Sequence, residues 1–440
     1  MVGFLSFFLC VPAVAMLLFT GFYLSVLSGW LQVRKLPLAI SSLFASGKGK
    51  KFSSVAALCA IVGGNLGVGN ISGTAVALRA GGPGFIVWMV LIVVVTSIIK
   101  YANCYVSIAT RMPVNGRIIG GPVVYVKHAL GTWASFAIAI VTAVCAITVG
   151  NLVQVNSLSI PMHLMDLSPL VAGMLMTLVL FFVSALGMNF IAKTVSSVVP
   201  VMTLSYLALC VIVLAKFHSN ILPSLELIFA SFLNLGSLKN GVTLAFIAEV
   251  LAVVQVGALR GIFATDIGLG LEGIIHSLVV NEDNDKRFAV QQSLISLISP
   301  FIVAVVAFMT TMVLLVTGVW SDISLESTNM CFTAFMNTLG TGYTEYVLVI
   351  LMFCFSFTTV LTWLMCSKET IMYVLKKDFY GKAWTAFFIA ITPLGSVCAV
   401  KLLWDVADLS ISLAIIVNTI GVLIMTAKYR DMFEGVHPNK

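Results

Sequence analysis

The sequence predicts an all-α polytopic membrane protein, in which one extra N-terminal helix precedes an inverted repeat of five plus five spanning helices. Of the 440 residues, 60% are hydrophobic and 9% are charged, and the mean hydropathy is +1.10. Eleven apolar windows have the length of a membrane span, about 20 residues. Two of these windows, the first of each repeat, are interrupted by glycines. So apolar a composition excludes a soluble domain.

The expected spans form a single transmembrane domain over residues 1–440. They lie near residues 8–30, 54–79, 84–110, 132–156, 168–190, 195–216, 242–280, 289–317, 343–366, 383–401 and 408–428. The span over 8–30 carries no basic residue before Arg34. Because a cleaved signal peptide normally begins with positive charge, we expect this span to be an uncleaved peripheral helix. The first five-helix repeat then covers 54–216 and the second covers 242–428.

The basic residues indicate the orientation of the spans. Alternate loops hold 18 of the 24 Lys and Arg residues, namely 31–53, 111–131, 191–194, 281–288, 367–382 and 429–440 together with Lys428. The opposite side carries Arg79, Lys216, Lys239 and Lys401. Under the positive-inside rule the first set is cytoplasmic, so we expect the N-terminus outside and the C-terminus inside. On the outer side, the connections 217–241 and 318–342 are each expected to contain a short interfacial helix.

The first interruption, GGNLGVGN, brings glycines and amides into the middle of a span. Glycine destabilises a helix by about 1 kcal/mol relative to alanine, so the glycines between Gly63 and Gly69 should unwind it. Inside a bilayer, unwound backbone needs partners, and its carbonyls suit a cation while its N–H groups suit a carboxylate. Close packing of helices through small residues is the alternative. Packing does not explain the amides of Asn65 and Asn70.

The second interruption, GALRGIFATDIGLGLEG over 257–273, opens the second repeat. Interrupted helices at matching positions of two five-span halves indicate an inverted-repeat secondary transporter. Arg260 and Asp266 are a candidate gate pair, because unpaired charges at this depth are costly. For Glu272 and His276 two interpretations stand equally: an ion pair inside the membrane, or solvation at the cytoplasmic interface.

Other classes of function are poorly supported. An ion channel would need a selectivity ring or a repeated pore helix. An intramembrane enzyme would need a catalytic pair, and the sequence contains no HExxH, no GxSxG and no aspartate dyad. The nine cysteines form no CxxC and indicate neither a disulfide nor a zinc site. The net charge of +7 is scattered over short loops, unlike a nucleic-acid-binding surface. We expect no enzyme, and an ion channel is the alternative from a different class.

Several motifs, in order, resemble the alanine/glycine:cation symporters, a bacterial family of sodium:alanine symporters. They are GGNLGVGNISGTAVALRAGGPGFIVWM, GGPVVYV at 120–126, GNLVQVNS at 150–157, LRGIFATDIGLGLEGIIH at 259–276 and FSFTTVLTW at 355–363. The likeness runs along nearly the whole chain. It implies the ten-helix inverted-repeat core of the neurotransmitter:sodium symporters, preceded by one helix, in the bacterial cytoplasmic (inner) membrane.

The resemblance implies Na+ as the coupling ion and no organic cofactor. Carbonyl groups near Gly63 and Leu66, with the hydroxyls of Thr358 and Thr359, would form the sodium site. Hard cations prefer oxygen ligands, and an unwound helix supplies carbonyls. The alternative for the two threonines is ordinary hydrogen bonding back to their own helix.

The resemblance also implies an amino-acid site between the two interruptions. N–H groups around Gly67, Gly69 and Asn70 would face the carboxylate, and the dipole of the half-helix would help. Phe263 would wall the side-chain pocket, and the facing span would contribute Gln154 and Asn156. The implied substrate-binding residues are Asn65, Gly67, Val68, Gly69, Asn70, Gln154, Asn156, Phe263 and Ala264.

The chain departs from the family pattern at three places. Val68 stands where the family usually has Thr, which removes a hydroxyl donor at the carboxylate end. The stretch Ala264–Asp266 stands where the family has Ser-Asn-Glu, so the acid is kept in shortened form. Asn103 stands where a Glu usually lies, and we therefore expect Lys100 to have lost its partner.

The function expected from these observations is secondary active symport by alternating access. The protein would import a small neutral amino acid, D- or L-alanine or glycine, with Na+. The expected partners are this amino acid and membrane lipid, with no nucleic acid. The alternative is a proton-coupled transporter of a different small amino acid, in which Asp266 or Glu249 carries the proton.

Overall fold

The computed structural model describes residues 2–45, 53–164, 166–233, 261, 264–279, 286–325, 327–340, 342–398 and 400–436. These residues form helices almost throughout, as the apolar windows predict. Two short strands, β1 (Met112–Val114) and β2 (Arg117–Ile119), make an antiparallel hairpin between two helices. The described part of the chain is therefore an α-helical bundle with one hairpin at its end.

The helices of the first half run from the N-terminus to the segment before residue 234. They are α1 (Val2–Leu27), α2 (Leu31–Arg34), α3 (Leu36–Ala45), α4 (Ser54–Asn65), α5 (Gly69–Gly81), α6 (Phe85–Thr96), α7 (Ile98–Thr110), α8 (Pro122–Leu130), α9 (Thr132–Ile147), the π-helix η1 (Thr148–Leu152), α10 (Val153–Leu164), α11 (Pro169–Ala185), α12 (Met188–Lys216), η2 (His218–Asn220) and α13 (Ile221–Leu233).

The remaining helices of the described residues that carry a label begin at Leu271. They are α15 (Leu271–Ser277), α16 (Lys286–Ser296), α17 (Ile298–Val316), η4 (Val319–Ser321), α18 (Ser327–Leu339), α19 (Tyr343–Leu375), α20 (Asp378–Ile391), η5 (Thr392–Ser396), α21 (Val400–Lys428) and η6 (Arg430–Val436). The helices α13 and α18 lie in the connections 217–241 and 318–342, so each connection contains a short helix as expected; their position at the membrane interface stays a prediction.

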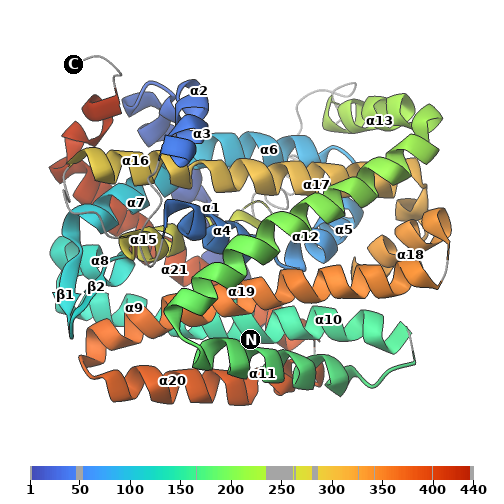
Figure 1. Cartoon of the computed structure of the whole chain (residues 1–440). Helices are drawn as coiled ribbons and strands as arrows, with labels where there is room; N and C mark the ends of the chain where they lie inside the picture. The colour runs from blue at the N-terminus through green and yellow to red at the C-terminus, as the bar shows by residue number, and fades with distance from the viewer. Residues whose placement is uncertain are drawn as a thin grey trace.

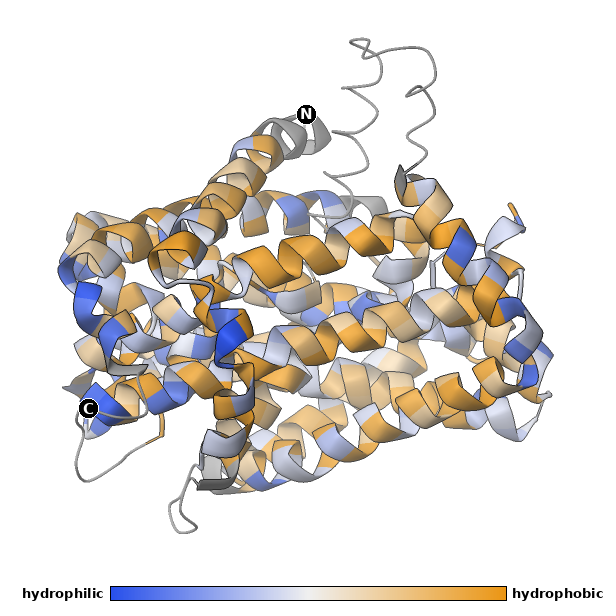
Figure 2. Cartoon of the chain, turned by 90° about the horizontal axis from the view of Figure 1, so that it is seen from above, coloured by the Kyte–Doolittle hydropathy of each residue, from blue (hydrophilic) through white to orange (hydrophobic). Residues whose placement is uncertain are grey.

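Most long helices run side by side, from left to right in Figure 1. The hairpin, α8 and α15 lie at one end of the bundle, and α13 and α18 lie at the other (Figure 1). Hydrophobic residues cover the lengths of the helices, and many hydrophilic residues gather towards the two ends (Figure 2). Large apolar side chains on α12, such as Val201 and Leu204, are exposed on the outside. This is the surface that a bilayer covers.

Seven helical stretches are long and apolar enough to cross a membrane, and the bent pair α4–α5 makes up to eight. They correspond to seven predicted spans and to the first interrupted one. The apolar helix α11 is shorter, at 17 residues, and α20 has 14. The window 242–280 lies largely outside the described residues. The count of eleven spans and the five-plus-five repeat therefore stay predictions.

The first interruption is present in the structure. Helix α4 ends at Asn65, α5 begins at Gly69, and the two axes differ by 41°. The residues between them are not helical, as the glycine content predicts. The span is therefore broken rather than only packed closely through small residues.

The described part of the second interruption is also irregular. Asp266 has φ +51°, and Gly268 and Gly270 have φ +89° and +76°, values that favour glycine. Helix α15 begins only after this turn. The two glycines therefore permit the backbone reversal that brings Asp266 next to the first break.

Candidate functional site

A small site lies where the first span is broken. It is lined by Gly64, Asn65, Gly67, Gly69, Asn70, Val149, Gln154, Asp266, Thr359 and Trp363. Five segments meet there: α4, α5, the π-helix η1 with α10, the turn before α15, and α19. The cavity measures about 10 Å³, roughly the space of one water molecule. In this conformation the site is too small to hold an amino acid.

Gln154 connects the facing span to the break. The backbone N–H of Val68 donates to Oε1 of Gln154 at 3.1 Å, and Nε2 of Gln154 donates to the Val149 carbonyl at 3.2 Å. A Cβ at Gly67 would lie 2.5 Å from the same Oε1, so only glycine allows this approach. Val149 lies in η1, and such π-helical turns often occur at functional sites.

Two amide side chains at the break have unused hydrogen-bonding atoms. Nδ2 of Asn65 and Oδ1 of Asn70 are buried and have no hydrogen-bond partner within the described residues. Nδ2 of Asn70 donates to the Asn65 carbonyl, which secures one end of the break. Buried polar atoms are normally paired, so an unpaired donor and acceptor beside a cavity are suited to a polar ligand.

Oxygen atoms from α4 and α19 meet on the other side of the break. The Gly63 carbonyl accepts from Oγ1 of Thr359 at 2.8 Å and from Oγ1 of Thr358 at 3.3 Å. Thr358 also donates back to the Cys354 carbonyl at 3.0 Å, as the alternative interpretation expects. A Cβ on Gly63 would lie 2.7 Å from Val199 and 3.0 Å from Thr358. Glycine therefore lets α4 approach α12 and α19 this closely.

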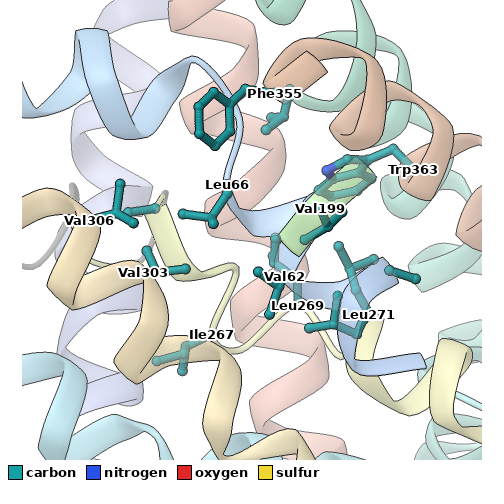
Figure 3. Close-up of a cluster of buried hydrophobic side chains, with 14 of the residues drawn as sticks. Val62, Leu66, Val199, Ile267, Leu269, Leu271, Val303, Val306, Phe355 and Trp363 are labelled. Atoms are coloured by element: carbon teal, nitrogen blue, oxygen red, sulfur yellow. The ribbon is translucent and has the colours of Figure 1, made fainter. Parts of the chain in front are cut away.

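The apolar surroundings of the break come from several helices. The side chains of Val62 and Leu66 lie among those of Val199 on α12, Val303 on α17 and Phe355 on α19, with further members in Figure 3. The Leu66 side chain is fully buried. Packing without water lowers the local dielectric constant, and this strengthens the hydrogen bonds made at the break.

Not every predicted site residue reaches the cavity. Nδ2 of Asn156 donates to the carbonyls of Gly395 at 2.9 Å and Cys398 at 3.2 Å, so this amide secures η5 instead. Val68 and Ala264 are buried but do not line the cavity. The gate candidate Arg260, together with Phe263 and Glu249, lies outside the described residues.

Asp266 is the acidic residue at this site. Its side chain is 2% exposed and lines the cavity, and no hydrogen bond joins its carboxylate to any residue within the described ranges. Trp363, one turn after Thr359, is a lining residue that the sequence analysis missed. Its Nε1 also lacks a partner among the described residues. The spacing of four residues on one helix could have revealed it.

Gly150 explains how Trp363 approaches η1. A Cβ at Gly150 would lie 2.8 Å from Cδ1 of Trp363 and closer still to Cγ. The first residue of the GNLVQVNS motif is therefore required by an aromatic ring about 200 positions further along the chain.

A buried charged network lies behind the cavity. Nζ of Lys100 lies 3.5 Å from Oε2 of Glu272, and both side chains are fully buried. Nδ2 of Asn103 donates to Oε1 of Glu272 at 2.7 Å, and Asn418 donates to Oδ1 of Asn103 at 3.2 Å and to the Gly268 carbonyl at 2.8 Å. This network ties α7, α15 and α21 to the turn before α15.

One sequence prediction about these charges is wrong, and one of the two interpretations left open for Glu272 and His276 is excluded. Lys100 has kept a partner, because Glu272 reaches it from α15 and replaces the carboxylate absent at position 103. Solvation at the interface is excluded for Glu272 and His276, since both are fully buried. Nδ1 of His276 lies 3.0 Å from Oε1 of Gln292, whose Nε2 donates to Ser54 at 2.7 Å.

The fold is that of helical membrane transporters. The structure matches that of MhsT in complex with L-phenylalanine with a TM-score of 0.60, covering 88% of this chain and 90% of that chain. Their sequences are 12% identical, so the likeness concerns the fold alone. With its apolar helices, the chain is a multi-pass integral membrane protein.

The chain belongs to the sodium:alanine symporter family, whose sequence model matches residues 1–435. An uncharacterized transporter of Haemophilus influenzae is 30% identical, covering 99% of this chain and 96% of that protein. The sodium/alanine symporter AgcS of Methanococcus maripaludis is 27% identical over 93% and 91% of the two chains. A putative sodium/proton-dependent alanine carrier, YrbD of Bacillus subtilis, is 26% identical over 94% and 87%. The family consists of transporters, not of enzymes.

Proposed function

We propose that this protein imports a small neutral amino acid, alanine or glycine, together with Na+ by alternating access. The observation that carries the proposal is the meeting of Gly63, Thr358 and Thr359 oxygens beside an amide-lined cavity at a broken helix. Membership of the sodium:alanine symporter family supports the same substrate class and coupling ion.

The amino acid would bind at the break itself. Its carboxylate would accept from backbone N–H groups at the start of α5, where the helix dipole favours negative charge. Its ammonium group is positive and would be received by side-chain carbonyl oxygens, for which Oδ1 of Asn70 is available. The cavity in this conformation is only water-sized and must open to admit even glycine, so the proposed small substrate follows from the family.

Sodium would bind between α4 and α19. The Gly63 carbonyl and the two threonine hydroxyls are neutral oxygen ligands, which suit a hard monovalent cation. On binding, the cation would replace the hydroxyl protons as the partner of the Gly63 carbonyl. The proposed site also includes the carbonyl of Leu66, in the unwound segment of the same break.

The wild-type protein in proteoliposomes should accumulate labelled alanine when a Na+ gradient is imposed and not without one. Thr359→Ala removes a proposed ligand and should abolish the stimulation by sodium. Thr370→Ala is the matched control, because Thr370 lies on the same helix and its hydroxyl donates only to the Cys366 carbonyl in its own helix. Uptake by Thr359→Ala with unchanged sodium dependence would refute the sodium site.

Proton coupling is the second candidate, and Asp266 is the observation that favours it. Its carboxylate lines the cavity and has no hydrogen-bond partner among the described residues. A carboxylate in such a position can take up and release a proton. Uptake driven by a pH gradient in the absence of sodium, and lost in Asp266→Asn, would support proton coupling over sodium coupling.

We also propose the location and orientation that go with import. The membrane would be the bacterial cytoplasmic membrane, with the N-terminus outside and the basic loops in the cytoplasm. The end of the bundle that carries the hairpin β1–β2 would then face the cytoplasm (Figure 1).

A further inference from the structure

A second cavity, far larger than the first, lies beside the hairpin at one end of the bundle. It measures about 460 Å³, and we call it the hairpin cavity. Its walls come from the hairpin β1–β2, the end of α8, the first turn of α9 and the end of α19. The lining residues are Met112, Pro113, Val114, Asn115, Lys127, Thr132, Ser135, Phe136, Tyr373, Val374 and Lys376.

The walls of the hairpin cavity are held by specific contacts. Nδ2 of Asn115 donates to the Lys376 carbonyl at 3.0 Å. Nη1 of Arg117 lies 3.7 Å from Oε1 of Glu369, which fixes the hairpin to α19. Oγ of Ser135 donates to the Val123 carbonyl at 2.6 Å and fixes α9 to α8. The cavity is therefore preformed rather than a gap between independent loops.

The charge in the hairpin cavity is positive. Lys127 and Lys376 line it, both side chains are solvent-exposed, and no acidic residue is among the lining residues. Neither lysine forms a salt bridge with an acidic side chain of the described ranges. Nζ of Lys127 lies 6.0 Å from the ring centroid of Tyr373, so its ammonium group is held over the cavity wall.

The start of α9 adds to this field. The helix has 16 residues, and its first residue, Thr132, lines the cavity. No side chain caps its N-terminus, where unpaired N–H groups and the helix dipole favour an anion. Two lysines and a helix N-terminus thus converge on one cavity, and this combination is suited to a phosphate group.

An apolar track leads from the cavity along α9. Phe136 lines the cavity and is itself 44% exposed, while Trp133 and Ile140, on the same face, are 86% and 51% exposed. Spacings of three, four and seven residues place these side chains in one stripe. Trp133 is of the residue type that is enriched at the level of the lipid headgroups.

We propose that the hairpin cavity binds the phosphate of an anionic phospholipid, with the acyl chains lying along the stripe of Trp133, Phe136 and Ile140. The stripe favours a lipid over a free phosphate, because it continues from the cavity and the acyl chains of a lipid held there would lie on it. Since this end is expected to be cytoplasmic, the lipid would come from the inner leaflet, where anionic headgroups attract basic residues.

A bound lipid would join two elements of the transport site. Helix α9 continues through η1 into α10, which carries Gln154, and the cavity wall from α19 belongs to the helix that carries Thr359. The headgroup would bridge Lys127 on α8, which leads directly into α9, and Lys376 at the end of α19. This inference does not depend on which amino acid or ion the protein transports.

Native mass spectrometry of the purified protein with added phosphatidylglycerol tests the proposal, with phosphatidylcholine of the same acyl chains as the zwitterionic probe. We expect one phosphatidylglycerol to be retained more tightly than phosphatidylcholine. Lys127→Gln with Lys376→Gln should weaken its retention by roughly 25-fold, about fivefold for each lysine. The matched control is Lys382→Gln with Lys428→Gln, which removes the same charge from exposed positions that do not line the cavity.

Retention of phosphatidylglycerol by the control variant, with loss in the cavity variant, would support the site. Equal retention by both variants would refute it, and so would equal retention of the two lipids by the wild type. A third arm adds inorganic phosphate at millimolar concentration. Binding of phosphate without any retention of phosphatidylglycerol would show a site for a soluble anion and would overturn the lipid assignment.

Discussion

The backbone N–H of Val68 donates to the side-chain oxygen of Gln154 across the gap between the broken helix and the facing span. This bond closes the place where, on the proposed function, the amino-acid carboxylate would bind. A substrate that takes the Val68 N–H must therefore displace Gln154, whose amide would then turn to the substrate. Gln154 is thus expected to hold the closed site in one state and the amino acid in the other.

Gln154→Ala should weaken the binding of every amino-acid substrate. Loss of a hydrogen bond to a charged group typically costs about 1.5–3 kcal/mol, or roughly tenfold to more than a hundredfold in affinity. Competition of small amino acids against labelled alanine measures this. Asn156→Ala is the comparison, because its amide bonds to the backbone near η5. Equal losses in the two variants would contradict the assignment of Gln154.

Val68→Thr tests where the side chain of residue 68 points. The family usually has Thr here, but the Val68 side chain does not line the cavity, so we expect unchanged affinities for alanine and glycine. The same competition series measures them. Tighter alanine binding by the variant would show that residue 68 faces the substrate in another state of the protein.

Glu272→Gln should destabilise the protein strongly. It leaves the Lys100 ammonium group buried without its partner, a change that typically costs 3–5 kcal/mol. The midpoint of thermal unfolding of the purified protein should fall, and Lys100→Met combined with Glu272→Leu should recover part of the loss. Glu226→Gln, at an exposed position on α13, is the matched control. If Glu272→Gln unfolds at the same temperature as the wild type, the ion pair contributes nothing to the stability of the protein.

Gly150→Ala should disturb the approach of Trp363 to η1. The added methyl group would meet the indole ring, and overpacking of this kind costs about 1–3 kcal/mol. Gly73→Ala is the control, because a Cβ there would meet no atom within 4 Å and alanine favours a helix. We expect reduced unfolding temperature and uptake for Gly150→Ala only. If both variants have the same unfolding temperature and the same uptake, then contact with Trp363 does not require glycine at position 150.

Cysteine labelling tests the orientation. In a cysteine-free background, Ile323→Cys, at an exposed position after η4, should react with an impermeant reagent added outside intact cells. Lys376→Cys should react only after the membrane is permeabilised, because the basic loops are expected inside. The opposite pattern would reverse the orientation and move the hairpin cavity to the outer leaflet.

The broken helix could be predicted from sequence because its cause is local. Four glycines within seven residues, from Gly63 to Gly69, weaken a helix wherever the chain lies. The Gly63 contact with Thr358 and Thr359 could be named only through the family resemblance. No pattern within either segment indicates that they meet.

The errors arose from contacts between distant segments. The pairing of Lys100 with Glu272 depends on the packing of α7 against α15, which no local periodicity reveals. Asn156 stands in the expected motif, yet it lies two residues from Gln154 and so faces a different neighbour on a helix. Trp363 was missed because an aromatic residue in an apolar span is most often a packing residue.

Thr359 lies at the junction of the two proposed binding positions, since its hydroxyl bonds to the Gly63 carbonyl while its side chain lines the cavity. A residue shared in this way makes the two ligands thermodynamically linked. Whatever factor sodium contributes to the affinity for alanine, alanine must contribute to the affinity for sodium. The water-sized cavity adds a second term: if the open state is populated to about 1%, each apparent affinity is roughly a hundredfold weaker than the intrinsic one. Two weakly bound ligands can then bind well together, because the first to arrive has already met the free-energy cost of opening.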